Sequence, residues 1–90
     1  MSKKEKLIAR FLEMPSDFHF NEMVKLIGYF GFFEVKTGKT SGSRVRFENQ
    51  DGVPIFLHKP HPSGIMKNYQ LKVLLEKINF ILIMKIEKLF

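Results

Sequence analysis

Residues 44–58, RVRFENQDGVPIFLH, decide the fold because they predict a β-hairpin with one defined register. Two runs with the alternation of a strand, Ser43–Glu48 and Val53–His58, lie on either side of a short polar segment. We expect that segment to form a three-residue loop, in which Gly52 takes the left-handed backbone conformation that this hairpin closure favours.

The loop length fixes which residues face one another across the hairpin. Pairing Asn49 with Val53 places Arg44 opposite His58 and divides the side chains between two faces. The apolar face then carries Val45, Phe47, Val53, Ile55 and Leu57, and the other face carries Arg44, Arg46, Phe56 and His58. A loop one residue shorter or longer would mix the two sets, so the sequence favours this register.

Two helices are predicted before the sheet. Ser2 and Glu5 fit a capping box at the start of a helix over residues 2–14. A second helix over Phe20–Phe30 has apolar residues at helical spacing, and Gly31 suits a left-handed residue at its end.

A further strand over Phe32–Thr37 precedes the hairpin, and a helix that begins near residues 65–67 follows it. The order α-α-β-β-β-α predicts an α+β fold, in which helices cover one face of a three-stranded antiparallel sheet. Residues 78–90 form an apolar tail that could extend the helix, form a strand or serve as a protein-contact surface. We expect a single domain over residues 1–90.

Composition narrows the classes of protein to consider. Hydrophobic residues make up 44% of the chain, which indicates a folded globule rather than a disordered segment. The absence of cysteine excludes a disulfide framework and thiol chemistry. The longest apolar run, Phe80–Met84, is too short to cross a bilayer, and the start of the chain does not resemble a signal peptide. We therefore expect a cytoplasmic protein without a membrane partner.

The charge distribution favours a polyanionic partner. The formal net charge is +6, and no acidic residue occurs in residues 35–47 or 52–75. These two windows contain Lys36, Lys39, Arg44, Arg46, Lys59, Lys67 and Lys72. Nucleic acid is the first candidate, because each neutralised phosphate releases counterions, and an acidic protein is the second.

Two motifs that look chemically informative are rejected. Residues 37–40, TGKT, lack the earlier glycine and the following helix of a P-loop. His58 and His61 lie among prolines and have no further ligands nearby, so we expect no metal and no other cofactor.

The predicted neighbours Arg44 and His58 are the candidates for chemistry. Histidine exchanges a proton near neutral pH, and arginine can hold a phosphate with two hydrogen bonds. Together they suffice in principle for metal-independent RNA cleavage through the adjacent 2′-hydroxyl. The alternative is a histidine that only contacts phosphate or stacks on an aromatic ring.

The segments GYFGF, KTSGSRVRF, PIFLH, LHKPHPSG and YQLK resemble, in order and spacing, the HicA toxins of bacterial toxin–antitoxin systems. The resemblance covers about residues 20–75. It implies a double-stranded-RNA-binding-like fold, mRNA interferase activity, and neutralisation by a HicB antitoxin encoded beside the toxin. In that family a catalytic histidine follows the glycine and serine that open the second strand. Here Arg44 follows Gly42 and Ser43.

Three residues are therefore candidates for catalysis: His58 for proton transfer, Arg44 as a phosphate clamp, and His61, whose loop could approach the same face. The candidates for RNA binding are Lys36, Lys39, Ser43, Arg46, Phe56 and Lys59. Phe56 is either a platform for base stacking or a residue covered by the tail. The alternatives to a nuclease are a non-catalytic RNA-binding module and an interaction domain for an acidic protein.

Overall fold

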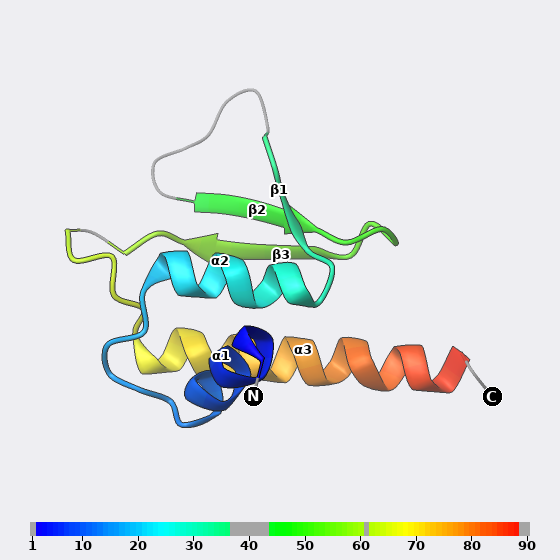
Figure 1. Cartoon of the computed structure of the whole chain (residues 1–90). Coiled ribbons are helices and arrows are strands. Elements are labelled where there is room, and N and C mark those ends of the chain that lie inside the picture. The colour runs from blue at the N-terminus through cyan, green and yellow to red at the C-terminus, as the bar shows by residue number, and fades with distance from the viewer. Residues whose placement is uncertain (1, 37–43, 61, 89–90) are drawn as a thin grey trace.

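The computed structural model describes residues 2–36, 44–60 and 62–88, with side chains up to residue 84 in the last helix. Three helices lie on one side of a three-stranded sheet (Figure 1). The elements are α1 (Lys3–Leu12), α2 (Phe20–Tyr29), β1 (Phe33–Val35), β2 (Arg44–Glu48), β3 (Pro54–His58) and α3 (Asn68–Lys88). This confirms the predicted α+β class and the order α-α-β-β-β-α.

The sheet has the order β1-β2-β3, with both pairs antiparallel. The hairpin register is the predicted one, since Arg44 pairs with His58 and Phe47 with Ile55. Gly52 has a φ of 76°, in the left-handed region that the three-residue loop requires.

The side chain of Asn49 holds the hairpin loop in place. Its Oδ1 accepts hydrogen bonds from the backbone N–H groups of Asp51 and Val53, at 3.0 and 2.9 Å. Asn49 is the buried polar residue of the described chain, with 6% of its surface exposed. Because this buried side chain accepts the backbone N–H groups of both Asp51 and Val53, it fixes the length of the loop and therefore the register of the two strands.

The apolar face of the sheet packs against the helices. The hairpin contributes Phe47, Ile55 and Leu57 to the core, and these residues alternate with polar or exposed neighbours. The helices and connectors contribute Phe11, Phe18, Phe20, Met23, Leu26, Ile27, Phe32, Met66, Leu71, Leu74 and Ile78. The opposite face of the sheet carries no helix in the described part of the chain (Figure 1).

The third helix begins at Asn68, later than the predicted start near residues 65–67. Ile65 instead forms a β-bridge with His19, which joins the connector after α1 to the connector before α3. The backbone N–H of Phe20 donates to the carbonyl of Gly64 at 2.8 Å. This bond satisfies one of the free N–H groups at the start of α2. Gly64 and Ile65 therefore pair with the start of α2 and do not enter α3.

The apolar tail continues α3 as far as Lys88, so it extends the helix and does not form a further strand. The end of α3 extends beyond the other elements in Figure 1. Its exposed apolar side chains include Phe80, Ile83 and Met84, with 64%, 55% and 45% of their surfaces exposed.

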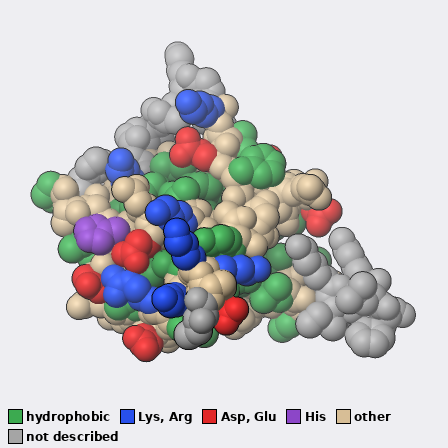
Figure 2. Space-filling model, in the orientation of Figure 1, with side chains coloured by type: hydrophobic (Ala, Val, Ile, Leu, Met, Phe, Trp, Pro, Cys, Tyr) green, Lys and Arg blue, Asp and Glu red, His purple; other side chains and the backbone are tan. Residues whose placement is uncertain are grey.

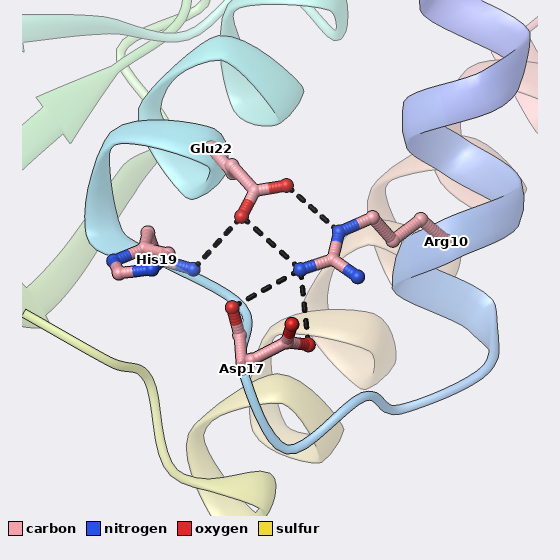
Figure 3. A network of polar contacts seen from close by, with 4 residues as sticks. All are labelled: Arg10, Asp17, His19 and Glu22. Atoms are coloured by element: carbon pink, nitrogen blue, oxygen red, sulfur yellow. Dashed lines mark hydrogen bonds and ion pairs between the residues drawn. The ribbon is translucent and has the colours of Figure 1, made fainter.

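A polar network fastens α1 to the rest of the molecule (Figure 3). Arg10 of α1 donates through Nε to Glu22 of α2 at 2.9 Å and through Nη2 to Asp17 in the connector at 3.1 Å. The carboxylate of Glu22 also accepts the backbone N–H of His19 at 3.1 Å, which caps the start of α2. The Arg10 guanidinium lies 5.6 Å from the centre of the buried Phe18 ring.

The network shifts the titration of both partners. The hydrogen bond from Arg10 holds the pKa of Glu22 below its ordinary value, although partial burial acts in the opposite direction. The same bond raises the pKa of Arg10. The Glu22 carboxylate is therefore a group that stabilises the fold in its charged form.

Candidate nucleic-acid interface

The solvent-facing side of the hairpin gathers the cationic and aromatic residues of the predicted site. We call Arg44, Arg46, Phe56 and His58 the arginine face. Residues directly opposite one another in an antiparallel sheet lie on the same face, and the register pairs Arg44 with His58 and Arg46 with Phe56. The structure therefore brings these four predicted site residues together on one surface.

Two guanidinium groups lie within cation–π distance of the Phe56 ring. The guanidinium carbon of Arg44 is 4.4 Å from the centre of the Phe56 ring, and that of Arg46 is 5.5 Å away. These are cation–π distances, so the ring orients both arginines on the sheet surface. The Phe56 ring points away from the helices and is 39% exposed, so the described part of the tail does not cover it.

The two arginines differ in their other contacts. Arg46 forms an ion pair with the carboxylate of Glu48, two residues along the same strand, and its Nε is buried without a hydrogen-bond partner among the described residues. Arg44 is exposed, and it makes no ion pair within the described ranges. Arg44 thus has its hydrogen-bond donors available to an anion, whereas Arg46 is already partly neutralised.

His58 is exposed at the end of β3, directly across the strand pair from Arg44. Its backbone carbonyl accepts a hydrogen bond from the side chain of Gln70 in α3 at 3.4 Å. No hydrogen bond or ion pair of its imidazole occurs in the described part of the molecule, so the ring is accessible to a ligand on the arginine face.

The remaining candidates lie elsewhere or outside the described residues. The Lys59 ammonium lies 6.0 Å from the centre of the Phe20 ring, on the side of the sheet that the helices cover. The structure therefore does not bring Lys59 to the arginine face. Lys36 is exposed just after β1. Lys39, Ser43 and His61 fall outside the described ranges.

The structure adds two residues to this surface that the sequence analysis missed. Phe33 of β1 pairs with Glu48, so both lie on the same side of the sheet as the arginines. Phe33 is 54% exposed, more than Phe56. The spacing of Glu48 from Arg46 signals a shared strand face, but no sequence pattern fixes the register of β1.

The helical side of the molecule has a different charge pattern. Figure 2 shows acidic and basic side chains interspersed over this side. Each of α1 and α2 carries an acidic residue in its first turn, Glu5 and Glu22. Mixed charges of this kind are a poor surface for a polyanion, so the arginine face is the better candidate interface.

Comparison with known proteins identifies the family. The family model of the HicA toxin of bacterial toxin–antitoxin systems matches residues 20–80, which is more than half of the chain. The chain belongs to the HicA toxin family. The match spans α2, the whole sheet and most of α3, while α1 lies outside it. Neither a curated protein nor a solved structure matches the chain.

The described residues contain neither a membrane-spanning helix nor a cluster of metal ligands. No described helix has both the length and the apolar character required to cross a membrane. No cluster of three or more histidine, aspartate, glutamate or cysteine side chains in the described part of the chain could hold a metal ion. Membership of the HicA family implies that this toxin has an antitoxin partner.

Proposed function

We propose that this HicA-family toxin binds RNA on the arginine face, cleaves mRNA there, and is neutralised by a HicB-like antitoxin. The observation that carries the proposal is the pairing of Arg44 with His58 on an exposed sheet face, within a chain of this family. An accessible cation and an accessible imidazole lie side by side, and their chemistries are complementary for phosphodiester cleavage.

The cleavage step uses the 2′-hydroxyl of the RNA as the nucleophile. His58 accepts the proton of that hydroxyl while its oxygen bonds to the adjacent phosphorus. The bond from phosphorus to the 5′-oxygen breaks, and this oxygen takes a proton from the imidazolium or from water. Arg44 donates two hydrogen bonds to the non-bridging oxygens and stabilises the negative charge of the pentacovalent transition state.

RNA binding combines charge with stacking. Arg44 supplies the available guanidinium, and Phe33 and Phe56 are exposed aromatic rings on the same side of the sheet. Stacking of a base on such a ring contributes about 1–3 kcal/mol. The resemblance assigns the catalytic histidine of the family to the position held here by Arg44, so proton transfer in this chain is assigned to His58 across the strand pair.

The test compares Arg44→Ala and His58→Ala with the parent chain. Each protein is expressed alone, with growth and mRNA integrity as the readouts, and is assayed in purified form for RNA cleavage. His19→Ala is the matched control for histidine, because His19 is exposed at the start of α2 away from the arginine face. Lys25→Ala is the control for loss of one positive charge on the helical side.

We expect both site variants to lose cleavage by at least 100-fold and both control variants to retain it. An active His58→Ala protein would remove His58 from the mechanism. Salt-dependent RNA binding by the parent without cleavage would support a non-catalytic RNA-binding module instead. If the parent fails to bind RNA at low salt, the remaining alternative is that the chain is an interaction domain for an acidic protein.

A further inference from the structure

An apolar groove runs along the outer edge of β3, between that strand and α3. One hollow of about 150 Å³ is lined by residues that include Leu57, Tyr69 and Val73. A second hollow of about 340 Å³ is lined by residues that include Val73 and Phe80. The two hollows share Ile55, Val73 and Lys77, so they form one continuous groove.

The helical wall of the groove is an exposed apolar stripe. Tyr69, Val73 and Phe80 have 63%, 49% and 64% of their surfaces exposed, and their spacing places them along one side of α3. The distance along the helix from Tyr69 to Phe80 is roughly 16 Å at 1.5 Å per residue. An extended strand of about five residues has the same length, and β3 itself has five residues.

The strand wall of the groove presents unpaired backbone groups. The N–H of Asn49 donates to the carbonyl of Val53, so these two residues form a hydrogen-bonded pair. By alternation, Ile55 and Leu57 also direct their backbone groups toward β2, and Phe56 directs its N–H and C=O toward the outer edge. No strand pairs with this edge in the described part of the chain.

We infer that the groove accepts an extended segment of the partner antitoxin as a fourth strand, with apolar and acidic residues in alternation. Its apolar side chains contact the stripe of Tyr69, Val73 and Phe80. Its acidic side chains lie on the solvent side of the sheet, beside Phe56. The Arg44 guanidinium lies 4.4 Å from the centre of that ring and has no ion pair within the described ranges, so it meets a carboxylate there.

Charge decides between this partner and a second copy of the chain. Pairing β3 with β3 of another copy would place two arginine faces side by side, within about one Debye length. Each copy carries a formal net charge of +6, so this arrangement is repulsive, whereas an acidic strand is attracted. The acidic side chains of the added strand would engage Arg44, the cation proposed to hold RNA, so the antitoxin would neutralise the toxin by competing with RNA for it; this step rests on the proposed function.

The test uses the full chain in complex with the antitoxin encoded beside it. Val73→Arg places a charge in the exposed apolar stripe without altering the arginine face or the buried core. Leu12→Arg is the matched control, because Leu12 is 55% exposed on α1, away from the groove. We expect Val73→Arg to weaken the complex at least tenfold and to remain toxic when the antitoxin is present, while Leu12→Arg leaves the affinity unchanged.

Amide hydrogen exchange of the unaltered chain provides a second readout that does not depend on the folding of a variant. We expect the Phe56 amide to exchange at least tenfold more slowly in the complex than in the free chain. An unchanged Phe56 exchange rate would overturn the inference, as would an unchanged affinity of Val73→Arg. Dimerisation of the free chain that Val73→Arg abolishes would also overturn it, by assigning the groove to a second copy.

The failure of this inference can be distinguished from the failure of the proposed function. If the parent chain neither binds RNA nor arrests growth but its Phe56 amide is protected in the complex, the proposed function is refuted and the inferred role of the groove is retained. If the chain is toxic and cleaves RNA but its Phe56 amide stays unprotected in the complex, the inferred role of the groove is refuted and the proposed function is retained.

Discussion

Replacing Asn49 with alanine tests whether one buried side chain sets the register that aligns Arg44 with His58. The substitution removes the oxygen that accepts the backbone N–H groups of Asp51 and Val53. Each lost hydrogen bond costs about 1 kcal/mol, so the expected loss in the free energy of unfolding is about 2 kcal/mol. For a chain of this size, that loss lowers Tm by roughly 8–16 °C.

Thermal and urea unfolding followed by circular dichroism measure this effect. Asn49→Asp retains an acceptor oxygen and should keep most of the stability, and Asn21→Ala removes an exposed asparagine from α2 as a control. We expect Asn21→Ala to change the stability by less than about 0.5 kcal/mol. If Asn49→Ala is no less stable than Asn21→Ala, the carboxamide does not set the hairpin loop and the reasoning is refuted.

Three further predictions concern the core, the polar network and the site. Phe47→Ala should lower the free energy of unfolding by about 3–5 kcal/mol in urea titrations, because this ring is fully buried, and a loss under 1 kcal/mol would contradict that packing. Glu22→Gln should lower Tm by roughly 3–5 °C at neutral pH, because the charged form of Glu22 pairs with Arg10. Since that pairing holds the pKa of Glu22 below its ordinary value, its contribution is present above about pH 4.3 and is lost as the pH falls through the lower folded pKa. A Tm difference between parent and variant that does not shrink as the pH falls below about 4.3 would count against this. Glu48→Gln should tighten RNA binding several-fold at low salt and steepen its salt dependence by about one unit of slope, because Arg46 loses its competing carboxylate, and weaker binding would exclude this role of Glu48.

The hairpin could be predicted in detail because its determinants are local. The alternation of side chains and the loop at Gly52 act over about fifteen residues, and together they fix which residue faces which. The arginine face follows from that register, since Arg44 and His58 are neighbours for the same reason that Phe47 and Ile55 are buried together.

The other contacts join segments that are distant in sequence and carry no local signal. The bridge between His19 and Ile65 delays the start of α3, because backbone groups paired across two connectors cannot enter a helix. The contacts of Arg10 with Glu22, and the position of Phe33 on the arginine face, depend on how separate elements pack. Charge and periodicity alone could not specify either contact.

The sequence by itself determined the class of fold, the hairpin register and the basic character of the surface, because alternation, turn chemistry and net charge act locally or by composition. The tertiary structure alone decided that the apolar tail is helical, that two guanidiniums lie close to the Phe56 ring, and that a groove opens beside β3. These features arise where elements meet. Their energies depend on which surfaces are brought together, and a linear pattern of residues does not contain that information.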